Sequence, residues 1–558
     1  MKPPNSYILV ILIVVLAAIL RITFAQGIPL SGDEVISVIQ ATGQAVTYQN
    51  RHWPDNVPLS ELKNFISYSE DHSVRNLFVS LRDAGMHPPF YYIVLRYFLK
   101  YIGNDAFYLR LFSIILSLFS IVCIYLLGKT VCNDRVGVLS ALILAISSYG
   151  IKYGAMVRPY PLAMLLSIVA TTLVYQLCKD EKFAFINLKT IIYMLTILIG
   201  LYTIYHFVFV VILHLVMVVA HNIRNKKVLF RVVFLYGFVT VCYLPWLPFL
   251  LSQMKIIKAG SFYFHKKSGS PLFLSLFHST VYTNFLQSVG GESLSLLRLL
   301  ITAMIGGATF LGCIDLARDK KGRIFVGAIM AYLLSWFLAD LALGVRTLRV
   351  AKLHFFLVPI GVALLATGIF LAPERFHIKR SFMFVVCGIL LLNSIGICYA
   401  QTNYDGPGGM EMFQEKISRY VSRENQKQGL VLVNTARRRF LLPFAHVVNE
   451  PVDVYLVRMN ELRAGKFKLY DCEKYCYVFI ADIRVPTPNE TFLTENKLDI
   501  VKNHLLKCGF VFIDSAVTHI KYRPAKGVIL VFRKETSGCS DIIEGRRLFE
   551  PLISEHFS

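Results

Sequence analysis

Long apolar runs separated by short polar stretches dominate the first 400 residues of the chain. Eleven of these runs approach the roughly 20 residues that a helix needs to cross a bilayer. They lie at 7–26, 107–128, 136–152, 160–178, 188–204, 207–221, 229–250, 297–316, 324–343, 353–372 and 381–400. The pattern predicts a polytopic α-helical membrane protein with about eleven transmembrane helices.

Segment 88–103 decides the orientation of every later helix. It is short, carries Arg96 and Lys100, and can either span the bilayer or lie in its interface. Read as an interfacial helix, it leaves a set of basic loop residues in the cytoplasm, as the positive-inside rule requires. This set contains Lys129, Arg135, Lys179, Lys182, Arg224, Lys226, Lys227, Arg231, Arg318, Lys320, Lys321, Arg323, Arg375, Lys379 and Arg380. The same reading predicts a multi-pass protein of the inner (plasma) membrane, with residues 401–558 outside the cytoplasm.

Residues 401–558 carry a different pattern, in which short apolar runs alternate with amphipathic ones. Strands are expected at 429–434, 452–457, 477–482, 510–514 and 528–532, and amphipathic helices at 410–423 and 490–506. Strands that alternate with helices predict a small α/β domain. The expected division is a transmembrane domain at 1–400, whose first outer loop at 27–106 contains interfacial helices, and a soluble extracytoplasmic α/β domain at 401–558.

Composition agrees with a membrane protein. Of the 558 residues, 55% are hydrophobic and 17% are charged, whereas soluble proteins carry about 25% charged residues. The formal net charge of +23 does not indicate a nucleic-acid partner. The basic residues sit in short loops between apolar runs, and they do not cluster with aromatic residues on a soluble face.

Four of the eleven cysteines lie in the C-terminal region, at Cys472, Cys476, Cys508 and Cys539. An extracytoplasmic compartment permits disulfides, and four cysteines allow three pairings. We expect at least one disulfide and favour one between Cys508 and Cys539. The alternative is a zinc site made by Cys472-x3-Cys476 and His504-x3-Cys508, but this spacing fits no well-attested zinc finger.

Asp33 and Glu34 form an acidic pair a few residues beyond the first apolar segment. Carboxylates at this depth are costly unless they take part in chemistry or coordination. With the orientation above, acidic, basic and other polar side chains from distant parts of the chain also lie at the non-cytoplasmic face of the membrane. They are Asp83, His87, Arg158, Tyr160, His206, Arg346, Arg349 and Lys352, together with the loop at 253–292. A site built from these residues would face away from the cytoplasm.

Five motifs follow one another along the chain: the acidic pair, HPPFYY, VRPYPLAMLL, YHF and PWLPFLLSQ. Their order resembles the bacterial GT-C glycosyltransferases over roughly residues 1–370, in the branch related to protein O-mannosyltransferases and lipid A aminoarabinose transferases. The resemblance implies an inverting enzyme that moves a sugar from a polyprenyl-phosphate donor to a glycan, lipid or protein acceptor at the non-cytoplasmic face. It also implies an outward C-terminal α/β domain.

Asp33 matches the position of the family's catalytic aspartate. The acceptor hydroxyl needs a carboxylate to take its proton as it attacks the anomeric carbon, and Glu34 is expected to complete a catalytic pair with Asp33. The alternative is that Asp33 only caps a helix beginning near Val35.

The leaving phosphate is anionic and needs cations in a dry site. The candidates for binding it are Arg158, Arg349 and Lys352. The alternative role for Arg158, Lys352 and their neighbour Arg346 is to extend towards the lipid interface as snorkelling side chains.

Asp83, His87, Tyr160 and His206 are expected to support the site. His87 could orient a carboxylate, bind a phosphate or ligate a metal. The alternative for His87 is a polar residue at a helix start set by its two following prolines. For His206, an interfacial aromatic cluster is an equally good explanation.

A metal requirement is not expected. Relatives commonly carry an acidic residue two positions before the arginine of the RPY motif, whereas this chain has Met156 there. Methionine does not bind hard cations such as magnesium or manganese. We therefore expect that no cofactor is required, and a divalent cation at Glu34, Asp83 and His87 is the less favoured alternative.

A flippase or transporter of lipid-linked sugars is the competing function. Such a protein is expected to have paired repeats, with helices broken by Gly or Pro at matching positions and ionisable residues near mid-membrane. The sequence has no such symmetry, and its polar residues gather at one face. This favours an enzyme.

Overall fold

The structure is a computed structural model of the 558-residue chain. It describes residues 6–26, 30–51, 56–85, 87–179, 187–260, 295–343, 353–375, 381–402, 414, 417–421, 428–434, 445–446, 448, 452–457, 469, 472–484, 495–520 and 525–535. The predicted amphipathic helix at 410–423 and the loop at 253–292 fall largely outside these residues. By internal contacts the chain divides into two compact units, Met1–Arg51 with Asn64–Tyr404, and His52–Lys63 with Asp405–Ser558.

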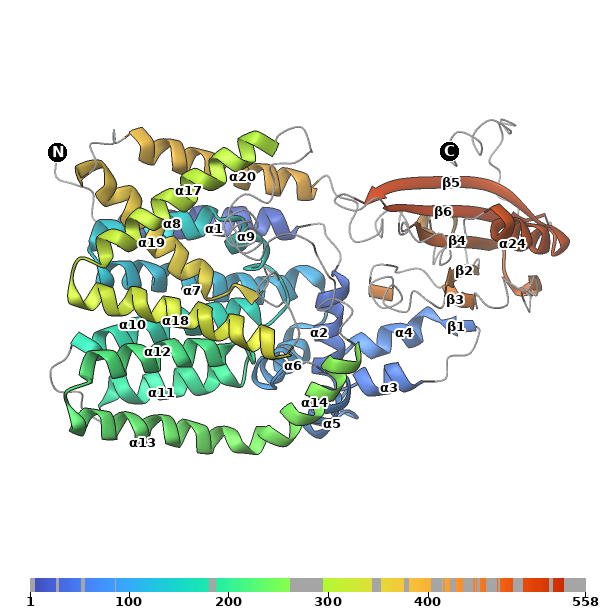
Figure 1. Ribbon diagram of the computed structural model, residues 1–558. Coiled ribbons are helices and arrows are strands. Elements are labelled where there is room, and N and C mark those ends of the chain that lie inside the picture. Colours follow the sequence, from blue (N-terminus) through green and yellow to red (C-terminus); the bar gives the residue numbers. More distant parts are fainter. Residues whose placement is uncertain are drawn as a thin grey trace. The chain divides into compact units, whose positions relative to one another are not determined.

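The first unit is a bundle of apolar helices (Figure 1). Every predicted apolar segment contains at least one helix. They are α1 (Ser6–Ala25), α7 (Ala106–Val131), α8 (Asp134–Ile146), α9 (Ser148–Lys152), α10 (Tyr160–Lys179), α11 (Leu188–Leu201), α12 (Phe207–Asn222), α13 (Lys226–Tyr243), α14 (Leu247–Gly260), α17 (Ser295–Leu316), α18 (Lys320–Leu343), α19 (Leu357–Arg375) and α20 (Ser381–Thr402). Among the described helices, five runs are long and apolar enough to cross a membrane, at Ser6–Ala25, Ala106–Val131, Tyr160–Cys178, Lys226–Met254 and Lys320–Ala342. The structure supports a helical membrane protein, and the number of eleven spans stays a prediction.

Shorter helices occupy the described part of the first outer loop. They are α2 (Gly32–Thr42), α3 (Ala45–Asn50), α4 (Leu59–Ile66), α5 (Val74–Ala84) and α6 (Phe90–Ile102). Helix α6 occupies the segment on which the predicted orientation depends, and its 13 residues are too few to span a bilayer. Its Tyr92, Leu95 and Leu99 side chains are buried, whereas Tyr97 and Tyr101 are 50% and 74% exposed. These two unlike faces agree with an interfacial helix.

Arg21 connects helices α1, α7 and α8 of the bundle through hydrogen bonds. Its side chain is fully buried in α1. Its Nε donates to the Ser117 Oγ of α7 at 2.8 Å, and its Nη1 donates to the carbonyl oxygen of Ala145 in α8 at 3.0 Å. Ala145 stands at the end of α8, where the last carbonyls have no partner within the helix. The buried guanidinium therefore fixes the end of α1, from which the chain runs to α2.

The second unit is built on a six-stranded sheet in the order β1-β3-β2-β4-β6-β5 (Figure 1). The strands are β1 (Asn56–Pro58), β2 (Gly429–Asn434), β3 (Val452–Val457), β4 (Tyr477–Arg484), β5 (Phe510–Ile520) and β6 (Ala525–Lys534). β2 is parallel to β3 and β4, and the other pairs are antiparallel. Helix α24 (Glu495–Lys507) contributes Leu505 to the apolar core that includes Val478 and Phe510. Each of the five predicted strands coincides with an observed one.

Strand β1 is the element of this unit that the sequence pattern did not predict. It comes from the first outer loop, yet Asn56 pairs with Tyr455 and Pro58 pairs with Asp453. The sequence-based division assigned these residues to the 1–400 domain. Three residues are too few to show an alternating pattern, and proline is normally found only at a sheet edge, where its missing N–H is tolerated. Because β1 is short and contains a proline, the sequence pattern gave no sign that these residues form a strand.

Cys476 and Cys508 are both disulfide-bonded. The prediction of at least one disulfide in the C-terminal region is confirmed. Cys539 lies outside the described residues, so the pairing of Cys508 with Cys539 stays a prediction. The zinc alternative is wrong, because a disulfide sulfur is not the thiolate that binds zinc.

Candidate functional site

Helix α2 carries both residues of the acidic pair, and its start is fixed by a capping box. Ser31 is the N-cap: its Oγ accepts from the Glu34 N–H at 3.4 Å, and the Ser31 N–H donates to Glu34 Oε2 at 2.7 Å. The helix begins at Gly32, not near Val35. Asp33 is therefore not the N-cap, because Ser31 and Glu34 fill that role, but it lies in the first turn, where the helix dipole favours a carboxylate.

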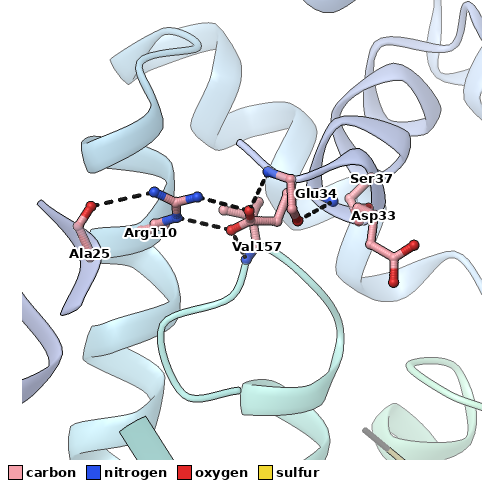
Figure 2. Close-up of polar contacts among 7 residues, drawn as sticks. Ala25, Asp33, Glu34, Ser37, Arg110 and Val157 are labelled. Atoms are coloured by element: carbon pink, nitrogen blue, oxygen red, sulfur yellow. Dashed lines mark hydrogen bonds and ion pairs between the residues drawn. The ribbon is translucent and has the colours of Figure 1, made fainter. Parts of the chain in front are cut away.

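Glu34 is 2% exposed, and four N–H groups donate to its carboxylate (Figure 2). Arg110 of α7 donates from Nε to Oε1 at 3.0 Å and from Nη2 to Oε2 at 2.9 Å. The Val157 N–H donates to Oε1 at 3.1 Å, and the fourth donor is the Ser31 N–H. Burial alone would raise the pKa of the Glu34 carboxyl, but the ion pair with Arg110 and these hydrogen bonds bring that pKa below its ordinary value. Glu34 is thus held as a carboxylate.

Arg110 also ties this pair to the end of the first helix. Its Nη1 donates to the carbonyl oxygen of Ala25, the last residue of α1, at 3.3 Å. One guanidinium therefore connects α1, α2 and α7.

Asp33 precedes Glu34 in α2 but its side chain points elsewhere. Figure 2 shows its carboxylate directed away from the Arg110–Glu34 pair, and the residue is partly exposed. Its backbone carbonyl accepts from the Arg158 Nη1 at 3.1 Å, and the Asp33 carboxylate interacts electrostatically with the same guanidinium. The two neighbouring carboxylates therefore differ: donors enclose Glu34, whereas Asp33 is accessible beside a cation.

Arg158 is 7% exposed and lies between α9 and α10. Its Nη1 donates to the Asp33 carbonyl and to Ser37 Oγ, both at 3.1 Å, and its Nη2 lies 3.0 Å from His87 Nε2. Its Cζ lies 5.8 Å from the ring centroid of Tyr160, which is buried at the start of α10. Its buried Nε has no hydrogen-bond acceptor among the described residues. Arg158 is therefore fixed on several sides.

His87 lies between α5 and α6 and is the acceptor in its contact with Arg158. Arginine can only donate, so a neutral His87 ring accepts at Nε2 and carries its proton on Nδ1. The ring stacks on Tyr92 of α6, with centroids 6.3 Å apart and planes inclined by 25°. The sequence-predicted residues Asp33, His87, Arg158 and Tyr160 are thus brought together.

Other predicted residues have different partners in the described part of the chain. Asp83 is exposed and accepts from the Nε of its neighbour Arg82 at 2.7 Å, and this hydrogen bond lowers the pKa of the Asp83 carboxyl. His206 packs its ring against Trp336 and Phe209, with centroids 5.5 and 6.0 Å away. Outside the described residues lie Arg346, Arg349 and Lys352, whose roles stay predictions.

The expectation that no metal is required stays a prediction. No three His, Cys, Asp or Glu side chains of the described residues are grouped so that they could hold a metal ion. Of the residues considered for a divalent cation, Glu34 is paired with Arg110 and Asp83 with Arg82. A ligand beside Arg158 would more readily be an anion.

Arg110 is a site residue that the sequence motifs missed. It lies in the apolar segment at 107–128, and a charged residue in such a segment normally has a specific partner. That signal was present, but the partner could not be named from the sequence, because 76 positions separate Arg110 from Glu34. Ser37 was also missed, since a serine inside a helix carries no distinctive pattern.

Two comparisons bear on this site. Residues 86–251 match the family model of the dolichyl-phosphate-mannose-protein mannosyltransferases, a stretch that includes His87 and Arg158. The fold is similar to that of ArnT from Cupriavidus metallidurans in the apo state, with a TM-score of 0.50 and 10% identity, over 94% of this chain and 97% of that chain. The predicted GT-C resemblance is confirmed.

Two further solved structures are similar to this chain. ArnT from Cupriavidus metallidurans bound to undecaprenyl phosphate has a TM-score of 0.49 and 12% identity, over 95% of this chain and 98% of that chain. The Archaeoglobus fulgidus oligosaccharyltransferase in complex with Zn and sulfate has a TM-score of 0.48 and 14% identity, over 85% and 67%. No curated protein sequence matches the chain. The family match supports the predicted class of enzyme, a glycosyltransferase with a lipid-linked donor.

Proposed function

We propose that this chain is an inverting membrane glycosyltransferase that moves a sugar from a polyprenyl-phosphate donor to an acceptor hydroxyl at the non-cytoplasmic face. The observation that carries the proposal is the accessible carboxylate of Asp33 beside the buried guanidinium of Arg158. Sugar transfer from a lipid phosphate needs both groups, a base for the acceptor and a cation for the leaving group. The charge pattern of the loops supports the orientation, with the second unit outside the cytoplasm.

In the proposed reaction, the Asp33 carboxylate takes the proton of the acceptor hydroxyl while the hydroxyl oxygen attacks the anomeric carbon. The bond between that carbon and the phosphate oxygen breaks, and the polyprenyl phosphate leaves with the bonding electrons. A single displacement from the opposite face inverts the configuration of the anomeric carbon. A positioned base of this kind accelerates a reaction by about 10²- to 10⁴-fold.

Arg158 is proposed to bind the donor phosphate. Its planar guanidinium suits phosphate oxygens, and contacts with Ser37 and His87 fix its plane. Because little water reaches a residue that is 7% exposed, its attraction for the leaving phosphate is strengthened. Arg349 and Lys352 are proposed to add further positive charge, and the transfer is proposed to need no metal.

Glu34 is assigned a positioning role, although the sequence pattern suggested a catalytic one. Donors from Arg110, Val157 and Ser31 occupy both of its oxygens. Its lowered pKa also makes it a weak base. By binding the Val157 N–H, Glu34 fixes the backbone next to Arg158.

Turnover of donor lipid by purified protein in nanodiscs tests the proposal. Undecaprenyl-phosphate sugars are supplied one at a time with a membrane extract as acceptor, and released undecaprenyl phosphate is measured by mass spectrometry. The parent should release it, whereas a flippase would leave the donor intact. The anomeric configuration of the product, read by NMR, should be opposite to that of the donor.

The decisive variant is Asp33→Asn, which keeps the shape of the side chain but cannot take a proton. Its rate should fall by about 10²- to 10⁴-fold. Asp83→Asn is the matched control, because Asp83 is an exposed carboxylate of the same outer loop that pairs with Arg82. If Asp33→Asn transfers sugar at more than about a tenth of the parent rate, Asp33 is not the base.

A further inference from the structure

Gln253 of α14 is fully buried, and its side chain joins separate segments of the first unit. Its Nε2 donates to the carbonyl oxygens of Leu81 at 2.6 Å and of His87 at 3.3 Å. Its Oε1 accepts from the Tyr205 hydroxyl, whose oxygen accepts in turn from Trp246 Nε1 at 3.0 Å. Both polar atoms of the amide are therefore engaged.

His87 connects Gln253 to the candidate site. The backbone of His87 is held by Gln253, while its ring accepts from Arg158. Arg158 donates in turn to the carbonyl oxygen of Asp33. A continuous series of contacts thus runs from α14 to the start of α2.

The chemistry of this position calls for an amide. Two carbonyl oxygens need N–H donors and one hydroxyl needs an acceptor, and glutamine supplies both kinds of group. An aliphatic side chain would supply neither. A glutamate carboxylate would direct an oxygen without a proton at the Leu81 and His87 carbonyls. Buried polar groups left without partners are costly, so other side chains should displace the segment around His87.

We propose that Gln253 is a positioning residue for sugar transfer: it holds the His87 backbone and, through the His87 ring, keeps Arg158 aimed at the donor phosphate. This inference rests on the proposed function and gives α14 a part in donor binding. A displacement of about 1 Å at a reacting group can cost about 100-fold in rate. Gln253→Ala should therefore lower kcat/KM by about 10- to 100-fold and weaken donor binding as well.

A double-mutant cycle between Gln253→Ala and His87→Ala tests the proposed route. Two quantities are measured, kcat/KM with an undecaprenyl-phosphate sugar that the parent turns over, and the affinity for undecaprenyl phosphate alone. If Gln253 acts through His87, the double variant should lose no more than His87→Ala alone. Losses that simply multiply would overturn the inference, because independent sites behave in that way.

Gln253→Glu provides a second test if the alanine variant does not fold. Its protonated form regains one O–H donor for the two carbonyls, whereas its carboxylate has none. Transfer by Gln253→Glu, expressed relative to the parent at each pH, should rise as the pH falls. A profile parallel to that of the parent would contradict the proposed role.

Gln44→Ala is the matched control. Gln44 is 7% exposed, and its Nε2 donates to the Asn64 carbonyl at 2.8 Å, away from the His87–Arg158 contact. This variant should keep the parent's kcat/KM and lipid affinity. A parent that binds undecaprenyl phosphate but transfers no sugar would refute the proposed function, while the variant affinities would still test Gln253. A parent that transfers sugar, with Gln253→Ala unchanged in rate and affinity, would refute only the role of Gln253.

Discussion

Replacing Glu34 by glutamine separates folding from catalysis at this site. The substitution preserves the size of the side chain but exchanges one carboxylate oxygen for an NH2 group. Each Glu34 oxygen accepts from two N–H groups, so glutamine loses the two hydrogen bonds at the exchanged atom. It also removes the negative charge that pairs with Arg110, which is itself only 5% exposed.

Removing one partner of a buried ion pair typically lowers the free energy of unfolding by about 3–5 kcal/mol. We expect a loss of this size for Glu34→Gln, measured by unfolding in mixed micelles with increasing SDS. The double variant Glu34→Gln/Arg110→Met should lose less than the sum of the two single variants, because it leaves no buried charge without a partner.

The Asp33→Asn variant, which changes the neighbouring carboxylate, is compared with Glu34→Gln. Its side chain is partly exposed, so the free energy of unfolding should stay within roughly 0.5 kcal/mol of the parent while transfer is lost. The reasoning would be refuted by a Glu34→Gln variant that is as stable as the parent yet transfers no sugar. In that case Glu34 would be a second catalytic carboxylate.

Four further outcomes are expected. The pKa of Glu34 is below its ordinary value of about 4.3. The contribution of Glu34 to the free energy of unfolding should therefore be complete above that pH and should be lost as the pH falls through the lower folded pKa. When unfolding is measured against pH, Glu34→Gln should not show this decrease in stability. Arg158→Ala should weaken undecaprenyl phosphate binding and transfer together, because the guanidinium is proposed to meet the phosphate in both ground and transition states; normal affinity would contradict this role. A reporter that is active only in the cytoplasm, fused after Ser558, should be silent, and a strong signal would reverse the orientation. Mass mapping without reductant should find Cys508 joined to Cys539, and another partner for Cys508 would disprove that pairing.

The helices and strands could be predicted from the sequence because each has a local signal. An apolar run such as 107–128 needs no distant partner to be recognised, and the apolar run 429–434 is a strand in the structure with the same bounds. Strand β1 had no such signal, because its three residues form a strand only by pairing with β3. Local pattern therefore gave most elements, while pairing between distant segments remained hidden.

The candidate site was predictable in part for the same reason. Motif order pointed to Asp33, His87 and Arg158, which the structure brings together. The sequence pattern could not show that the Glu34 carboxylate is paired with Arg110, since Arg110 lies in a different helix. It also offered no reason to connect Gln253 with His87, because a hydrogen bond from a side chain to a backbone carbonyl leaves no mark on the residue that accepts it.

Helix geometry explains why two adjacent acids take different roles. An α-helix turns by about 100° per residue, so Asp33 and Glu34 cannot both face the same partner. Residues four apart share a face, and Arg158 lies at that of Asp33 and Ser37, where it donates to the Asp33 backbone carbonyl and to Ser37 Oγ. Glu34 faces Arg110 and is spaced three residues from its capping partner Ser31. The short sequence SGDEVIS therefore places different residues on two faces of the first helix turn. On one face, Glu34 caps the helix start with Ser31 and pairs with Arg110 of α7. On the other face, Asp33 and Ser37 lie beside Arg158, which is proposed to bind the leaving phosphate.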